Sequence, residues 1–162
     1  MSPADEADRT PEKSARTSAL DEVVDLVSAL IRFDTSNTGE LETTKGEKEC
    51  AEWVAHKLAE VGYETEYVES GAPGRGNVFA TLAGADPARG TLLIHGHLDV
   101  VPAEPADWSV HPFSGAVEDG YVWGRGAVDM KDMVGMALAL ARQFKSNGTV
   151  PPRPIMFAFL AD

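Results

Sequence analysis

Cysteine is nearly absent from this sequence, because Cys50 is the single one among 162 residues. One cysteine excludes an internal disulfide framework and a cysteine-rich zinc cluster. Cys50 falls on the apolar side of an expected helix, which indicates a core thiol rather than a nucleophile. Long hydrophobic runs are absent too, since no apolar stretch approaches the roughly 20 residues that span a bilayer.

Basic residues are scarce, with 14 Lys and Arg against 26 Asp and Glu and a formal net charge of −12. A surface of this sign repels the phosphate backbone of nucleic acids and anionic membranes. We therefore expect a small molecule or a peptide as partner, and neither nucleic acid nor a membrane. The hydrophobic content of 43 % is ordinary for a globular protein with a real core.

Residues 1–17 carry charges of both signs and no apolar core, so they cannot form the hydrophobic region of a secretory signal. We expect a disordered tail over residues 1–17 and a single α/β domain over residues 18–162. A cytoplasmic location is the default that follows.

Two helices are expected at the start of this domain. The first begins at a capping-box pattern at 18–21 and carries apolar residues at helical spacing as far as Ile31. The second begins at a similar pattern at 44–47 and ends before Gly62.

Strands, a hairpin and a third helix follow. The run at 91–94 is continuously apolar, which is typical of a strand covered on both faces. The Asp-Gly pair within 116–123 predicts a tight hairpin. The remaining elements are expected as strands at 63–68, 77–82 and 155–160 and as an amphipathic helix at 133–144.

Polar side chains gather where the strand at 91–94 ends. His97 and Asp99 stand at its carboxyl end, which is where ligands bind in open α/β sheets. If the extended geometry continues, the two side chains leave on one face, so Asp99 can orient the imidazole of His97. Asp129 follows two glycines and precedes a helix, and its two carboxylate oxygens can bridge two cations. This pattern predicts metal-assisted hydrolysis.

Three motifs in order resemble those of the M20 metallopeptidases: His97-Leu-Asp-Val-Val-Pro102, Trp108-Ser-Val-His-Pro-Phe-Ser-Gly115 and Gly124-Arg-Gly-Ala-Val-Asp-Met-Lys131. That family includes acetylornithine deacetylase, succinyl-diaminopimelate desuccinylase, aminoacylase, carnosinase-type dipeptidases and glutamate carboxypeptidase. The resemblance runs from about Leu20 to the end of the sequence. It implies a three-layer zinc-peptidase-like catalytic domain, in which a mixed sheet is flanked by helices.

The resemblance also implies roles for individual residues. His97 would bind one metal ion, Asp99 would be the catalytic carboxylate that orients it, and Asp129 would bridge two Zn²⁺ ions, with Co²⁺ or Mn²⁺ as alternative metals. The peptide bond after Asp129 would be cis. Substrates would be N-acyl amino acids or short peptides, cleaved by a deacylase or carboxypeptidase reaction, and a lid domain would make the intact protein a homodimer.

Family members follow a strand like that at 155–162 with two consecutive glutamates, a general base and a ligand, and the sequence ends one residue short of them. We expect the 162-residue chain alone neither to hydrolyse substrate nor to hold two metal ions stably. One alternative is a non-catalytic remnant whose open sheet edge at 155–160 seeks a partner. Another is a metallohydrolase of a different superfamily that uses His95, His97 and Asp99.

The neighbours of these motifs have simpler interpretations. We expect His95 to line the pocket or serve a structural role. A solvated helix face and a role in catalysis explain Lys131 and Asp132 about equally well, and Arg125 either touches substrate or pairs with Asp132 or another carboxylate. We expect aromatic residues around the hairpin to pack it against the sheet and His111 to lie on a loop at the rim. The aromatic residues are Trp108, Phe113, Tyr121 and Trp123.

Overall fold

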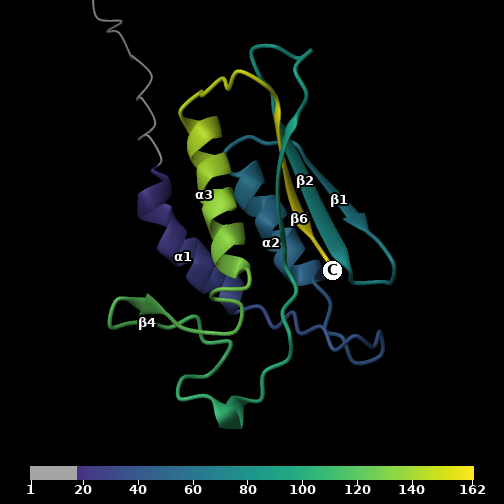
Figure 1. Ribbon diagram of the computed structural model, residues 1–162, viewed down its shortest axis with the longest axis vertical. Coiled ribbons are helices and arrows are strands. Elements are labelled where there is room, and N and C mark those ends of the chain that lie inside the picture. The colour runs from purple at the N-terminus through teal and green to yellow at the C-terminus, as the bar shows by residue number, and fades with distance from the viewer. Residues whose placement is uncertain (1–17) are drawn as a thin grey trace, which may run out of the picture.

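A computed structural model of the chain describes residues 18–162, so the tail expected over residues 1–17 lies outside the described residues. It has an α/β architecture with a mixed four-stranded sheet in the order β1-β2-β6-β3 (Figure 1). The sheet strands are β1 (Thr65–Glu69), β2 (Gly76–Leu82), β3 (Leu92–His97) and β6 (Ile155–Leu160). The helices are α1 (Ala19–Ile31), α2 (Lys48–Ala59) and α3 (Lys131–Ser146), and a short 3-10 turn covers Pro105–Asp107.

Strand β6 lies in the middle of the sheet. It pairs antiparallel with β2 and parallel with β3, and His97 at the end of β3 lies opposite Leu160 at the end of β6. The prediction of an open sheet edge at Ile155–Leu160 is therefore wrong, because both sides of β6 are hydrogen-bonded. The edges of the described sheet are β1 and β3.

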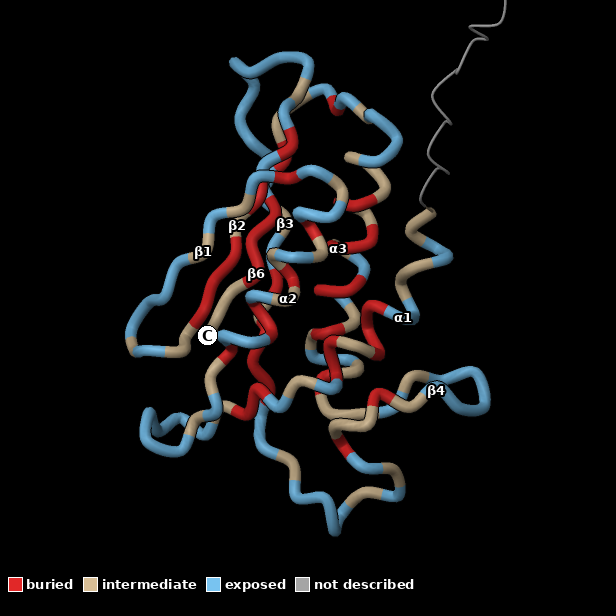
Figure 2. The backbone as a smooth tube through the Cα atoms, turned by 180° about the vertical axis from the view of Figure 1, so that it is seen from behind, coloured by how far each residue is buried: buried red, intermediate tan, exposed pale blue. Residues whose placement is uncertain are grey.

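Burial differs among the strands, since β2 and β6 are buried over most of their length and β1 is exposed or half-buried (Figure 2). The face toward the helices carries the buried side chains of β2 and β6, namely Val78, Ala80, Leu82, Ile155, Phe157 and Phe159. On the other face Leu93 is 53 % exposed and Met156 is 36 % exposed. The expectation that residues 91–94 are covered on both faces is wrong, since β3 is an edge strand that helices cover on one face within residues 18–162.

The helices begin as apolar patterning predicts, but not through the expected caps. Within residues 18–162, Ser18 makes no side-chain cap of α1, and its carbonyl accepts from the Asp21 N–H instead. Helix α2 begins at Lys48 rather than near Thr44. Glu47 is fully buried and its Oε2 accepts from Arg75 Nε over 2.8 Å, so it is not available to close a capping box.

Arg142 on α3 joins the three helices. Its Nε and Nη2 donate to the carboxylate of Glu22 on α1, each over 3.0 Å. Its Nη1 donates to Glu60 at the end of α2 over 2.9 Å and to the backbone carbonyl of Lys57. Arg142 is 9 % exposed, so these bonds act in a largely dry environment.

The hairpin forms where the Asp-Gly pair predicts it, as β4 (Val117–Glu118) and β5 (Tyr121–Val122). Asp119 and Gly120 have φ of 53° and 82°, the positive values that a type I′ turn needs. The hairpin extends away from the four-stranded sheet and lies beside α1 and α3 (Figure 1). Tyr121 is 68 % exposed, so the expectation that the hairpin aromatics pack against the sheet is wrong for this residue. Across residues 18–162, every helix is too short or too polar to cross a membrane.

Candidate metal centre

His97 is the last residue of β3, at the carboxyl end of a strand that parallel pairing places beside the end of β6. Its Nδ1 lies 3.0 Å from the backbone carbonyl oxygen of Asp99, so Nδ1 must carry a proton to donate. Asp99 Oδ1 lies 3.1 Å from the same Nδ1 but has no hydrogen-bond partner within residues 18–162. The contact of this carboxylate oxygen with the imidazole is therefore mainly electrostatic, and it leaves Nε2 free to face outward.

Asp129 comes to the same place from the loop that precedes α3. Its Oδ1 lies 3.3 Å from His97 Nε2, and the side chain of Asp129 is 88 % exposed. The peptide bond between Asp129 and Met130 is cis, as the family resemblance implies. The structure thus brings His97, Asp99 and Asp129 together, while their roles in metal binding and catalysis stay a prediction.

The short distance between His97 and Asp129 requires a positive species. With Nδ1 protonated, a neutral imidazole directs the lone pair of Nε2 toward a carboxylate oxygen, and two acceptors at 3.3 Å repel each other. A proton on Nε2 or a bound cation removes this repulsion. Burial lowers the pKa of His97, but hydrogen bonding to the Asp99 carbonyl and the charges of Asp99 and Asp129 outweigh it, so the pKa lies above the ordinary value.

The same distance suits two ligands of one zinc ion. Metal–ligand bonds near 2.0–2.1 Å at the tetrahedral angle place two ligand atoms about 3.3 Å apart. The pair of His97 Nε2 and Asp129 Oδ1 matches this spacing. In the described part of the chain no group of three or more His, Cys, Asp or Glu side chains comes close enough to hold a metal ion. These residues therefore fit two of the ligands of a tetrahedral site.

Asn37 belongs to this cluster although no sequence motif pointed to it. Its Nδ2 donates to Asp99 Oδ2 over 3.1 Å, from a loop 62 positions earlier. Asp99 is 8 % exposed, so this hydrogen bond satisfies an oxygen that water reaches poorly.

Lys131 lies beneath the site and is fully buried, which excludes the solvated helix face as the explanation of this residue. Its Nζ donates to the Phe33 carbonyl over 2.7 Å. Burial lowers the pKa of Lys131, and the nearby charges of Asp34 and Asp99 oppose that shift. Gly126 has a φ of 86°, and a Cβ there would lie 3.1 Å from Lys131 Cδ, so glycine gives this side chain its room.

Arg125 does not pair with a carboxylate among the described residues, so that one of its two expected roles is excluded. Its guanidinium lies over the Trp108 ring at 5.1 Å, and Nη2 lies 3.4 Å from the Pro102 carbonyl oxygen. Arg125 and Trp108 line a cavity of about 230 Å³ that Asp129 also borders. This cavity therefore lies next to the cluster of His97, Asp99 and Asp129.

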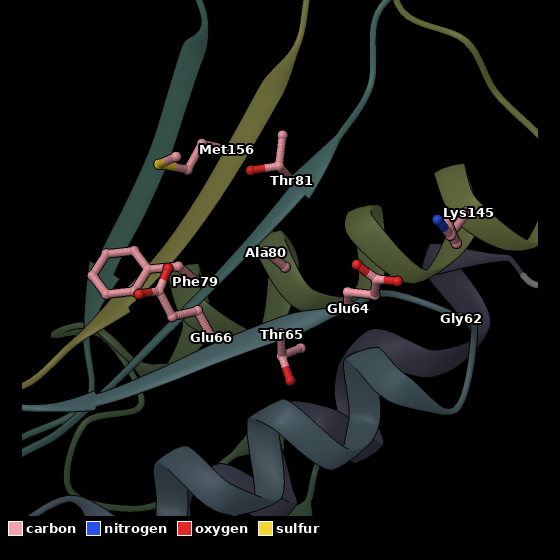
Figure 3. A pocket seen from close by; sticks show the side chains of 9 residues that line it. All are labelled: Gly62, Glu64, Thr65, Glu66, Phe79, Ala80, Thr81, Lys145 and Met156. Carbon is pink, nitrogen blue, oxygen red and sulfur yellow. The ribbon is translucent and has the colours of Figure 1, made fainter.

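A larger cavity of about 490 Å³ lies at the opposite end of the sheet. Figure 3 shows its lining residues, which come from the segment between α2 and β1, from β1, β2 and the start of β6, and from the end of α3. Glu64, Glu66 and Lys145 give it charge, but none of the predicted site residues borders it. Its size alone therefore does not make it the catalytic site.

The two other candidate histidines lie apart from this cluster. His95 is exposed on β3 and alternates with Gly96, so it leaves the strand on the same side as His97. His111 is exposed on a loop, where its Nδ1 accepts from the Phe113 N–H over 3.2 Å. Neither belongs to a group of three possible metal-binding side chains within residues 18–162.

Comparison with known proteins identifies the segment that carries these residues. Residues 93–162 match the model of "Peptidase family M20/M25/M40". This segment belongs to the M20 peptidase family. It includes His97, Asp99 and Asp129, which supports the M20 reading of the site over a metallohydrolase of another superfamily.

Individual relatives agree with this assignment. A succinyl-diaminopimelate desuccinylase of Methylorubrum populi is 39 % identical over 123 residues, which are 74 % of this chain and 29 % of that enzyme. The crystal structure of human carnosine dipeptidase 1 superposes with a TM-score of 0.71 at 27 % identity, over 87 % of this chain and 32 % of that one. An M20 family metallo-carboxypeptidase from Sulfolobus solfataricus shares the fold with a TM-score of 0.65 at 21 % identity, over 88 % of this chain and 30 % of that one. The chain thus spans less than a third of the length of these relatives.

Proposed function

We propose that the protein built on this M20 chain is a metal-dependent hydrolase of amide bonds in N-acyl amino acids or short peptides. The observation that carries the proposal is the 3.3 Å pair of His97 Nε2 and Asp129 Oδ1, with Asp99 behind the imidazole. The relatives named above are by name a succinyl-diaminopimelate desuccinylase, a dipeptidase and a metallo-carboxypeptidase, which supports amide-bond hydrolysis. Zn²⁺ is the metal that the histidine and carboxylate donors favour.

The residues of this chain would have distinct tasks. His97 would bind the metal through Nε2, because Nδ1 is occupied by Asp99. Asp129 would bind through a carboxylate that is open to solvent and has a second oxygen free for a second ion. Asp99 would hold the imidazole in its Nδ1–H form and raise its basicity. A bound metal ion would polarise the amide carbonyl and activate water for attack.

Replacement of Asp129 tests the proposal in the full-length protein. We expect Asp129→Ala to lower kcat/KM at least about 100-fold, since even outer-shell partners of a metal cost 10–100-fold. Zinc content, measured by mass spectrometry of the dialysed protein, should fall with it. The matched control is Asp132→Ala, because Asp132 lies three residues on and bonds the neighbouring Met133 N–H rather than His97. Unchanged turnover and zinc content in the Asp129 variant would defeat the assignment.

A substrate panel separates the deacylase and peptidase activities. We propose N-succinyl amino acids and dipeptides as the two classes to compare, each with its carboxyl-blocked ester as control. The ester should react more slowly if a free carboxylate is recognised. We also propose that the intact protein is a cytoplasmic homodimer, which cell fractionation and sedimentation velocity measure directly.

A further inference from the structure

We infer that Asn37 is a positioning residue, which holds the Asp99 carboxylate against the imidazole of His97 and so prepares Nε2 for metal binding. This inference rests on the proposed function. Asn37 follows α1 and reaches the end of β3 with its amide group. Its Nδ2 donates to Asp99 Oδ2 over 3.1 Å and to the Asp162 carbonyl over 2.7 Å.

The orientation of the Asn37 amide is fixed by its other end. Its Oδ1 accepts from the Gly39 N–H over 3.0 Å and from Thr44 Oγ1 over 3.3 Å. A backbone N–H can only donate, so the oxygen must face Gly39 and the NH₂ group must face Asp99. A flipped amide would place two acceptors against each other at Asp99 and two donors against each other at Gly39.

The backbone around Asn37 is also tied to the segment that carries Asp99. Asn37 N–H donates to the Val100 carbonyl over 2.8 Å, and Val100 N–H donates to the Thr35 carbonyl over 3.1 Å. Thr35 Oγ1 donates to the Leu98 carbonyl over 2.7 Å. The residues on either side of Asp99 are thus braced by the segment that presents the Asn37 amide, which makes this contact part of a defined geometry.

Removing the amide leaves a buried charge with fewer partners. Asp99 is 8 % exposed, its Oδ1 has no hydrogen-bond partner in the part of the chain that the structure describes, and its Oδ2 would lose the Asn37 donor. Such a carboxylate gains by rotating toward water, and rotation withdraws it from His97 Nδ1. We therefore expect Asn37→Ala to weaken zinc binding about tenfold, within the range for outer-shell partners of a metal ligand.

A double-mutant cycle tests whether Asn37 acts through Asp99. Zinc dissociation constants are measured by competition with a chelating dye in the intact protein, for wild type, Asn37→Ala, Asp99→Ala and the double variant. The expected result is a tenfold loss in the wild-type background and no further loss in the Asp99→Ala background. An unchanged dissociation constant in Asn37→Ala, or the same loss in both backgrounds, would overturn the inference.

Two further variants separate positioning from folding. Asn37→Asp keeps the size of the side chain but places a carboxylate against Asp99, so it should weaken zinc binding at least as much as alanine does. Tyr63→Phe removes a buried hydroxyl that donates to the Ala141 carbonyl in the core, so it should lower stability and leave the zinc dissociation constant unchanged. If the wild-type protein binds no zinc, both the proposed function and the inference are contradicted. If the wild-type protein binds zinc with the same dissociation constant as Asn37→Asp, the inference alone is contradicted.

Discussion

Among the described residues, two acidic or basic side chains, Glu47 and Lys131, are buried completely. Each has one strong partner, Arg75 for Glu47 and the Phe33 carbonyl for Lys131. Burial raises the pKa of Glu47 and lowers that of Lys131, because each charged form is costly away from water. Glu47 Oε1 has no hydrogen-bond partner among the described residues, so this carboxylate depends on its ion pair with Arg75.

The buried thiol of Cys50 gives a prediction at the scale of one residue. Burial raises its pKa to about 12, and the residue is fully buried in the core between helices and sheet. The reactive thiolate is therefore scarce at pH 8, and the reagent has no path to it. We expect no reaction with Ellman's reagent over an hour in buffer and complete reaction in 6 M guanidinium chloride. Rapid reaction of the native protein would show that α2 opens readily.

Sequence reasoning found some of these residues and missed others for a physical reason. His97, Asp99 and Asp129 stand in local patterns that predict the end of a strand and the start of a helix. Asn37 and Lys131 act through partners 62 and 98 positions away, and no local pattern encodes such distances. The burial of Lys131 also reverses the usual rule that lysine marks the exposed face of a helix.

At the scale of elements, the guanidinium of Arg142 links α1, α2 and α3 through hydrogen bonds. Arg142 reaches Glu22 and Glu60 from α3, so it fixes α1 and α2 against the helix between them. The side chains of Glu22 and Glu60 are 27 % and 32 % exposed, and contact with water weakens both ion pairs with Arg142. Burial raises the pKa of Glu60, but hydrogen bonds and charges from Lys57 and Arg142 outweigh it and hold the pKa below its ordinary value.

Arg142→Met should therefore destabilise the protein in a pH-dependent way. The loss of charged hydrogen bonds at neutral pH should cost about 1–3 kcal/mol of unfolding free energy. A carboxylate with a lowered pKa contributes stability above its unfolded value, near 4.5, and loses it as the pH falls through the folded value. The difference between wild type and variant should shrink between pH 7 and pH 3. Urea unfolding at several pH values measures it, and Arg153→Met, which removes an arginine outside this network, is the control.

Element boundaries were predicted well where periodicity sets them and poorly where capping was assumed. The hairpin, the last strand and α3 lie within two residues of their expected places, because alternation and Asp-Gly turns are local signals. The start of α2 was placed at Thr44, but Thr44 Oγ1 instead donates to Asn37 Oδ1 and the Glu40 carbonyl. A capping pattern is thus overruled when its residues bind elsewhere in the fold.

For the whole molecule, sheet order decides where chemistry can occur. The connection from β3 through α3 to β6 is a parallel crossover. The carboxyl ends of β3 and β6 and the start of α3 therefore meet at the same end of the sheet. The rule that ligands bind at the carboxyl ends of strands could be applied from the sequence alone. The place of β6 between β2 and β3 could not, because strand pairing joins residues more than 60 positions apart.

The central position of β6 predicts the pattern of hydrogen exchange. Amides of β6 bond on both sides, whereas those of β1 and β3 border an open edge. We expect the N–H groups of Phe157 and Phe159 to be among the slowest to exchange, and those of β1 to exchange faster by at least about tenfold. Exchange measured by NMR in D₂O checks this order. Equal protection in β1 and β6 would mean that the sheet opens as one unit.

The 3.3 Å gap between His97 and Asp129 joins positions that are 32 residues apart in the chain. A cation bound by both side chains would close the segment between β3 and α3 into a loop, as a removable cross-link does. Because closing a loop restricts the unfolded chain, the binding energy of the ion would appear as resistance to unfolding. Withdrawal of zinc should then loosen the stretch that carries Trp108 and the hairpin well before the core of the sheet gives way.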